Sequence, residues 1–195
     1  VEDVAFSTKG NSSLAFVAAE PGQNKYSFKV SFGTYSDGQT FHGLDKLNLN
    51  NFFCDATLMK DYFSYRLFRQ AGVPAPLTSY VWLTVNGRDH GLYLAVESLD
   101  RSFLNRAYDG EGVIYKPESK GLALSLDDVP DILEKGLTVP STPQGADLFY
   151  IDDDPASYPD IFENRETPAG EDDDRGVIAA LKRLHEGTDL STVLD

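Results

Sequence analysis

The clearest constraint in the sequence is a β-hairpin over residues 78–97. A run of β-branched and aromatic residues at 78–85 is followed by Asn86-Gly87, and a second apolar run covers 91–97. Asn-Gly is the preferred dipeptide of a type I′ turn, because both central residues of that turn need a positive φ. The hairpin places an antiparallel sheet in this part of the chain, and the other segments are interpreted as its neighbours.

A helix is expected directly before the hairpin, over residues 56–71. Asp55 is a good N-cap, and Gly72 followed by Val73-Pro74 is a good stop. The apolar side chains of this segment spread well beyond the stripe of about 100° that is typical of a surface helix. They are Leu58, Met59, Tyr62, Phe63, Tyr65, Leu67 and Phe68. This distribution predicts a helix that is covered on two sides.

Alternating residues predict further strands. The aromatic and apolar side chains of Tyr26–Phe32 alternate with Lys25, Ser27, Lys29 and Ser31. This alternation is typical of a half-buried strand, and it predicts that both lysines lie on the face away from the aromatic core. Shorter strands are expected at residues 4–8, 44–50 and 112–116, and a short helix at 100–106. These elements predict an α+β fold, in which a mainly antiparallel sheet carries a packed helix.

The composition excludes several classes of partner. The 195 residues carry a formal net charge of −14, which disfavours binding to nucleic acid or to an anionic membrane surface. No apolar run approaches the roughly 20 residues of a membrane span, so no membrane insertion is expected. The single cysteine, Cys54, excludes an internal disulfide and a cysteine-based metal cluster. A protein substrate or surface partner remains, and the oligomeric state stays open.

The acidic residues are unevenly distributed. They crowd the last third of the chain, which also holds five prolines between residues 140 and 168. This shift predicts two parts, a folded lobe at 1–120 and an acidic segment of loops and helices at 121–195. Helices are expected at 128–135 and 176–185 in the second part. The run Asp152–Asp154 lacks the glycine and the terminal glutamate of an EF-hand loop, which favours a solvated acidic surface over a Ca²⁺ site.

The residues alone allow one phosphate-binding hypothesis. The three histidines do not form a hydrolase motif, and no zinc or P-loop signature is present. A strand lysine fixed by an acidic helix residue is a common phosphate-binding pair, and Lys25 or Lys29 with Asp61 would suit it. The alternative is that these are ordinary exposed charges. Glu97 ends a strand among apolar neighbours and therefore needs a partner.

Several blocks of the sequence resemble, in order, the spore coat protein H (CotH) kinase family. The blocks are Lys9–Ser13, Lys25–Phe32, Gly43–Asn51, Leu67–Pro76, Val85–Gly87, Gly91–Glu97 and Tyr115–Lys116, with a less specific one at Tyr158–Glu163. Any one of them would be a weak signal, but their order across residues 9–116 is specific.

The resemblance implies an atypical protein-kinase-like fold, of which residues 1–120 would form the nucleotide-binding N-terminal lobe. Members of the family use ATP with Mg²⁺ or Mn²⁺ to phosphorylate Ser or Thr of coat or secreted proteins, so a spore-coat, exported or cell-surface location is expected. In the family the catalytic and metal-binding acids follow the region where this sequence stops. The metal ligands are therefore expected beyond Asp195, and the fragment alone is expected to be inactive.

The resemblance also implies roles for particular residues. The turn Lys9–Ser13, which contains Gly10, Asn11 and Ser12, would cover the phosphates. Lys25 or Lys29 would contact them, and Glu97 would lie at the hinge beside the adenine. Where the family commonly has a glutamate, this chain has Asp61, which is one methylene shorter. This departure motivates an alternative function, a non-catalytic surface or adhesion module that binds a protein partner.

Overall fold

The computed structural model describes residues 1–10, 12–118 and 145–187. Its contacts divide the chain into two compact units, residues 1–112 with 124–136 and residues 113–123 with 137–195. The described part of each unit contains its own cluster of buried apolar side chains. None of the helices described combines the length and the hydropathy needed to cross a bilayer.

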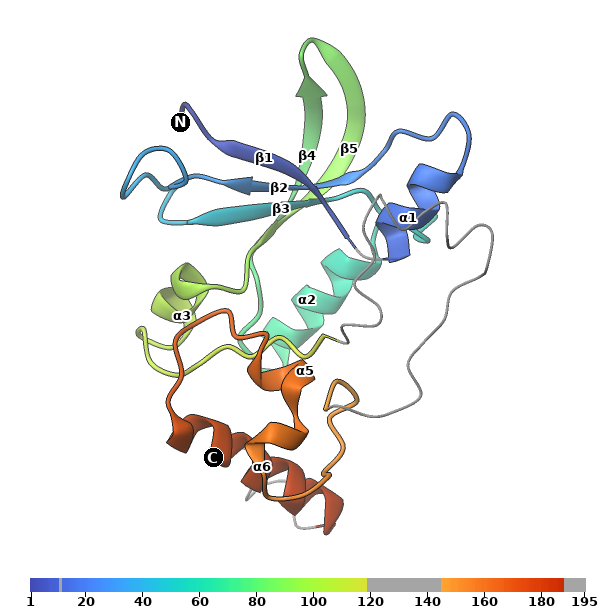
Figure 1. Ribbon diagram of the computed structural model, residues 1–195. Coiled ribbons are helices and arrows are strands. Elements are labelled where there is room, and N and C mark those ends of the chain that lie inside the picture. The colour runs from blue at the N-terminus through green and yellow to red at the C-terminus, as the bar shows by residue number, and fades with distance from the viewer. Residues whose placement is uncertain (11, 119–144, 188–195) are drawn as a thin grey trace. The chain divides into compact units, whose positions relative to one another are not determined.

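The first unit is built on a five-stranded antiparallel sheet in the order β1-β2-β3-β5-β4 (Figure 1). Its strands are β1 Ala5–Lys9, β2 Ser27–Ser31, β3 Lys46–Asn50, β4 Thr78–Val85 and β5 Arg88–Glu97. Its described helices are α1 Ser12–Ala19, α2 Lys60–Gln70 and α3 Arg101–Ala107. The predicted α+β class, with a mainly antiparallel sheet, is confirmed.

The alternation in β2 gives the sheet one apolar face. Phe28 lies opposite Leu49, and Leu49 lies opposite Ala95, so the three side chains share that face with the fully buried Tyr93. Lys29 lies one residue further along and therefore points to the other face, as predicted. The same prediction is wrong for Lys25, whose ammonium group lies over the ring of Tyr93 on the apolar side because a cation is attracted to an aromatic face. The Tyr93 hydroxyl donates a hydrogen bond to the Tyr26 carbonyl at 2.9 Å. Burial raises the pKa of Tyr93 to about 12.

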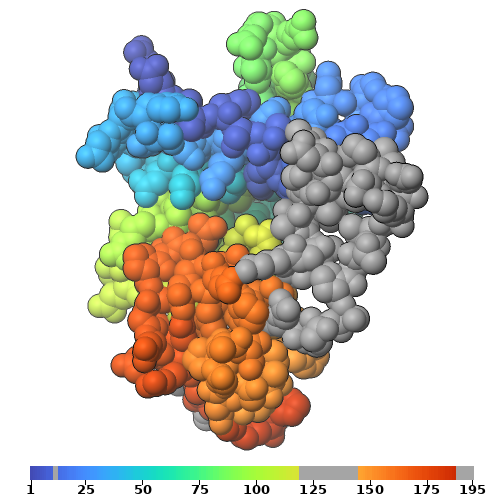
Figure 2. Space-filling model, in the orientation of Figure 1, coloured from blue at the N-terminus to red at the C-terminus, as the bar shows by residue number. Residues whose placement is uncertain are grey.

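The predicted hairpin is confirmed. Asn86 and Gly87 take φ values of +50° and +74°, and Val85 pairs with Arg88 directly across the turn. Both values lie in the region that the type I′ turn requires. The hairpin tip projects from the rest of the first unit in the space-filling view (Figure 2, green). The register shifts once between Leu83 and Thr84, which marks a β-bulge.

Helix α2 differs from its prediction in two ways. It begins at Lys60 rather than at residue 56, because residues 55–58 form a tight turn, whereas its end before Gly72 is as predicted. None of its side chains is buried, and Phe63, Leu67 and Phe68 are each about half exposed or more. The prediction of a helix covered on two sides is therefore wrong for this structure. The apolar side chains of a helix show that burying its surface would be favourable. They do not show that another element of the fold packs against that surface.

Three other segments differ from the sequence-based picture or fall outside it. Ser12 and Ser13, expected in a polar turn, instead begin α1, a helix that was not anticipated. Residues 112–116 do not form a strand, and within them Tyr115 makes one isolated bridge to Arg165 in the second unit. The helix expected at 128–135 lies outside the described residues.

Glu97 has the partner that its position requires. Its side chain is fully buried and accepts hydrogen bonds from Arg106 Nε at 3.0 Å and Arg106 Nη2 at 2.5 Å. The backbone N–H of Leu77 donates to the same carboxylate at 2.9 Å. Arg106 is held by α3, whose N-terminus is capped by the carboxylate of Asp100. The end of β5 is thus fixed by a bidentate ion pair inside the first unit.

Arg106→Ala would leave the Glu97 carboxylate buried without its counter-charge. Removing one partner of a buried pair costs about 3–5 kcal/mol, and we expect a loss at the lower end because the Arg106 side chain is 36% exposed. Urea denaturation would measure the change, with Arg101→Ala on the exposed side of the same helix as control. Equal stabilities of the two variants would contradict a stabilising role for this pair.

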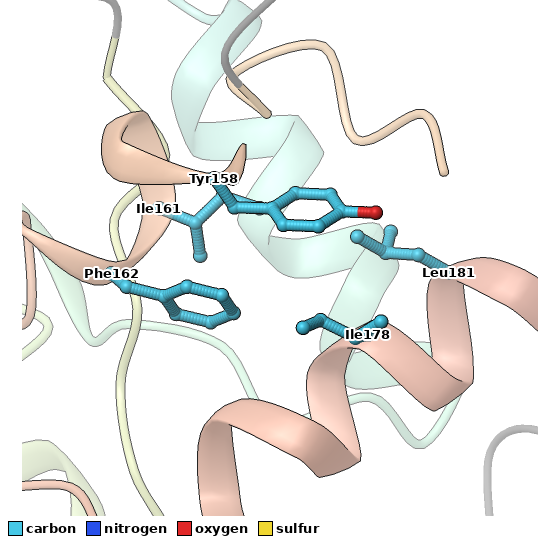
Figure 3. Close-up of a cluster of buried hydrophobic side chains, with 5 residues drawn as sticks. All are labelled: Tyr158, Ile161, Phe162, Ile178 and Leu181. Carbon is cyan, nitrogen blue, oxygen red and sulfur yellow. The ribbon is translucent and has the colours of Figure 1, made fainter. Parts of the chain in front are cut away.

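The second unit packs the short helix α5 (Pro159–Phe162) against α6 (Glu171–His185). Its core consists of Tyr158, Ile161, Phe162, Ile178 and Leu181, whose side chains point toward one another from the two segments (Figure 3). The short 3₁₀ helix η3 (Pro155–Ser157) precedes α5. Helix α6 begins five residues earlier than predicted, with four acidic residues in its first turn. Negative charge there is favourable because it faces the positive end of the helix dipole.

The hydroxyl group of Tyr158 ties the chain before η3 to this core. It accepts hydrogen bonds from the backbone N–H groups of Ile151 at 2.7 Å and Asp152 at 3.0 Å, and it donates to the Asp152 carbonyl at 2.8 Å. A single buried oxygen atom therefore satisfies three backbone groups.

Tyr158→Phe should destabilise the second unit by about 1–3 kcal/mol, the cost of leaving buried polar groups unsatisfied. Tyr150→Phe is the matched control, because the Tyr150 hydroxyl bonds only to the exposed Asp153 and Lys182 side chains nearby. Thermal unfolding followed by near-ultraviolet circular dichroism would compare them. A Tyr158→Phe protein as stable as the control would refute the assignment.

Candidate functional site

A groove of about 370 Å³ lies in the first unit where β1 ends, β3 ends and α2 begins. We call it the Lys9 groove. Its described lining consists of Lys9, Gly10, Ser13, Ser27, Asn50, Asn51, Phe52, Phe53, Cys54, Asp55, Lys60 and Asp61. Two ammonium groups and several amide and hydroxyl groups therefore line one concave surface.

A chain of two hydrogen bonds crosses the groove. Lys9 Nζ donates to Asn50 Oδ1 at 3.0 Å, and Asn50 Nδ2 donates to Asp61 Oδ2 at 3.2 Å. The sheet brings Lys9 and Asn50 together. Thr8, Phe28 and Leu49 lie side by side on one face of the sheet. Lys9 and Asn50 each follow one of these residues in their strands, so both side chains point to the other face. Lys9 and Asn50 are half-buried, whereas Asp61 is exposed in the first turn of α2.

The connection from β3 to α2 is held by the side chain of Asn51. Its Oδ1 accepts from Ser27 Oγ at 2.9 Å and from the Phe53 N–H at 3.1 Å, and its Nδ2 donates to the Lys25 carbonyl. Within this connection Phe52, Cys54 and Leu58 take φ values of +54° to +60°. Non-glycine residues in this region are strained and persist only where surrounding contacts hold them, which is common at functional sites.

The carboxylate of Asp55 holds the start of α2 by a hydrogen bond from Lys60, five residues further along the chain. This carboxylate is buried and accepts from the backbone N–H and hydroxyl of Thr57, at 3.0 and 2.6 Å, and from the Lys60 N–H at 2.8 Å. Burial alone would raise the pKa of Asp55. The hydrogen bonds from Thr57 and Lys60, with the charge of Lys60, outweigh burial and lower the pKa.

A second groove, of about 380 Å³, adjoins the first and shares Asn51 and Phe53 with it. Its other described lining residues are Phe16, Val17, Glu20, Gln23 and Lys25. The rings of Phe16 and Phe53 stack with their centroids 5.9 Å apart. Lys25 Nζ lies 5.8 Å from the ring centroid of Phe52 and 5.4 Å from that of Tyr93, within cation–π range.

The structure brings only some of the candidate residues together. Gly10 and Asp61 line the Lys9 groove, Ser12 begins α1, and Asn11 lies outside the described residues. Gly10 has φ +117°, and a Cβ atom there would lie 2.5 Å from Ser13 Oγ, so this position requires glycine.

The other three candidates lie elsewhere in the first unit. Lys25 lines the second groove, Lys29 lies in the middle of β2, and Glu97 is buried against Arg106. Lys29 and Glu97 are not among the described residues that line either groove. Their roles remain predictions.

Sequence reasoning missed Lys9 and Asn50 as partners of Asp61. Lys9 belonged to the turn Lys9–Ser13 that the resemblance assigns to the phosphates, but its ammonium group was not singled out as a contact. The available signal was a lysine at the end of a strand followed by a glycine, which places an ammonium group beside a tight turn.

The sequence of the chain matches the family model described as CotH kinase protein over residues 6–195. The chain belongs to the CotH kinase protein family. It is 30% identical over 91 residues to the inner spore coat protein H of Bacillus subtilis (strain 168), a match that spans 47% of this chain and 24% of that protein. It is also 46% identical over 44 residues to an inner spore coat protein H-like protein of the same organism, with 23% and 14% covered. The chain thus spans about a quarter of the first relative and less of the second.

The Lys9 groove of this CotH family member is suited to an anion. Lys9 and Lys60 supply positive charge beside the carboxylates of Asp55 and Asp61. Hydrogen-bond donors remain on Ser13 and on the second N–H of each amide group, whereas the Ser27 hydroxyl donates to Asn51. Among the residues that the structure describes, no cluster of three or more His, Cys, Asp or Glu side chains is arranged to hold a metal ion.

Asp55→Ala should remove the hydrogen bonds that order the start of α2 and lower the melting temperature by several degrees at pH 7. Because the pKa of Asp55 is lowered in the folded state, its contribution is present above the ordinary value of 3.8 and is lost as the pH falls through the folded-state pKa. The difference from the wild type should therefore shrink below pH 3.8. Melting curves across this range would show it, with exposed Asp37→Ala as control; a difference that persists in acid would contradict the capping role.

Proposed function

We propose that the Lys9 groove binds the phosphate groups of ATP and that the chain is part of a CotH-type protein kinase. The reaction would transfer the γ-phosphoryl group to Ser or Thr of coat or secreted proteins. The observation that carries the proposal is the ammonium group of Lys9, which Asn50 holds 3.0 Å away at the edge of a groove that also contains Lys60.

The charge distribution supports an anionic ligand. The chain has a net charge of −14, whereas the two lysines of this groove balance its two aspartates. One of these aspartates, Asp55, already accepts hydrogen bonds from the backbone of Thr57 and Lys60. Proteins that transfer phosphoryl groups mainly position the phosphates and offset their charge. Lys9 and Lys60 would hold the phosphates, and Gly10 would allow the backbone to approach them. Bound Mg²⁺ or Mn²⁺ would neutralise further charge.

Membership of the CotH kinase protein family supports the same function. The relatives from Bacillus subtilis are named as inner spore coat proteins, which supports a protein substrate in a coat or at a cell surface. Because this chain spans a quarter or less of those relatives, the activity, substrate and location of the whole protein are part of the proposal.

A non-catalytic module that binds a protein partner is the second candidate. The exposed apolar side chains of α2 favour it, since Phe63, Leu67 and Phe68 are 49%, 63% and 52% exposed. Exposed apolar side chains grouped on one element are typical of interaction surfaces. Calorimetry on the full-length protein separates the two candidates, because a module would bind no Mg-ATP at millimolar concentration.

Lys9→Ala should weaken Mg-ATP binding by the full-length protein by at least about tenfold, the size of one charge-assisted phosphate contact. Isothermal titration calorimetry would measure it, and ³²P transfer to a protein substrate would follow the activity. Lys46→Ala is the matched control, because Lys46 is a half-buried lysine of the same sheet that is absent from the described lining of both grooves.

Two further variants test the lysines implied by the family resemblance. If Lys25→Ala or Lys29→Ala abolishes binding while Lys9→Ala leaves it unchanged, the phosphate site lies elsewhere in the sheet and the assignment to the Lys9 groove is refuted.

A further inference from the structure

We infer that Asn50 is a positioning residue, through which the short carboxylate of Asp61 orients the ammonium group of Lys9. The inference rests on the proposed function, because it assigns Lys9 to the phosphates. It gives a role to Asn50, a residue of the resembling block Gly43–Asn51 to which the resemblance assigned none, and it gives Asp61 a role that does not need a direct salt bridge.

The side chain of Asn50 has the chemistry of a relay. Its oxygen accepts from Lys9 Nζ at 3.0 Å while its nitrogen donates to Asp61 Oδ2 at 3.2 Å. An amide carries an acceptor and a donor on two separate atoms of one planar group, whereas an ionised carboxylate only accepts and an alkyl side chain does neither. A carboxylate at position 50 would attract Lys9 but repel Asp61. The amide therefore matches one cation and one anion at the same time.

Asn50 and Asp61 both lie on ordered segments of the backbone. Asn50 is the last residue of β3 and pairs with Leu94 of β5, and the neighbouring Asn51 is held by Ser27. Asp61 lies in the first turn of α2, whose start is fixed by the hydrogen bonds to Asp55. A lysine side chain has many rotamers, and holding it in one place lowers the entropy that ligand binding must remove.

The relay explains how an aspartate can serve at position 61. A glutamate is longer by one methylene and could approach a lysine directly. An aspartate leaves a gap, and the amide group of Asn50 occupies it, with charge-assisted hydrogen bonds on both sides. Positions 50 and 61 are thus coupled. A small residue at 50 should require glutamate at 61, whereas asparagine at 50 should favour aspartate.

Lys25 shows the contrast. Its ammonium group lies over the rings of Phe52 and Tyr93, so aromatic faces rather than a carboxylate hold it. Lys9 is the lysine whose hydrogen-bond chain leads to the acidic residue of α2.

The test is a rescue experiment on the full-length protein. Asn50→Ala should raise the dissociation constant of Mg-ATP by roughly tenfold. Adding Asp61→Glu to Asn50→Ala should restore most of the affinity, whereas Asp61→Glu alone should bring no gain. Asn48→Ala is the matched control, because Asn48 is a half-buried asparagine on the same strand and face and does not line the groove.

The exposed Asp61→Asn variant provides a second route if Asn50→Ala does not fold. It keeps the size of the side chain but removes the charge, and it should weaken Mg-ATP binding several-fold. Thermal melts of all variants would report folding separately from binding.

The possible outcomes distinguish the inference from the proposed function. If Lys9→Ala weakens binding but neither Asn50→Ala nor Asp61→Asn does, the relay is refuted and the proposed function stands. If Asn50→Ala weakens binding and Asp61→Glu does not rescue it, Asn50 has only a structural role and the inference fails. If Lys9→Ala itself has no effect, the proposed function fails.

Discussion

The first unit depends on the way the chain passes from β3 into α2. Three non-glycine residues there adopt positive φ, and the side chains of Asn51 and Asp55 hold them with hydrogen bonds. Helix α2 has no buried side chain. Its place is instead supported by the Asp55 carboxylate at its start, by ring contact between Tyr62 and Tyr80, and by the hydrogen bond from the Tyr80 hydroxyl to the Leu58 carbonyl. The groove is therefore shaped by polar contacts more than by apolar burial.

The parts of the fold that local chemistry determines could be predicted. Alternation in Tyr26–Phe32 and the Asn86-Gly87 turn are properties of neighbouring residues, and both appear in the structure as expected. The start of α2 could not be placed, because the rule for an N-cap puts the helix immediately after Asp55. The chain instead inserts a turn, and the carboxylate reaches forward to the Lys60 N–H. That choice depends on burial of Asp55, which the sequence does not reveal.

The candidate site was harder to predict than the fold. Lys9 and Asn50 are 41 residues apart, and they meet only because β1 and β3 flank β2 and end on the same side of the groove. The alternation of residues drew attention to Lys29. Alternation shows which face of the sheet a side chain occupies, but it does not show which other element packs against that face. Burial reasoning did better with Glu97, because an ionised carboxylate among apolar residues demands a partner wherever it is found. Its identity, Arg106, required the placement of α3.

The aspartate at position 61 shows why one position should not be judged alone. Considered by itself, the loss of a methylene weakens the case for an ion pair and therefore for phosphate binding. In the structure the carboxylate still connects to a lysine, through an amide on a different element. The same electrostatic link can thus be made by one long side chain or by two short ones. The departure from the family pattern at Asp61 is therefore informative only together with the residue at position 50. The side chains of Asn50 and Asp61 together span the distance to Lys9.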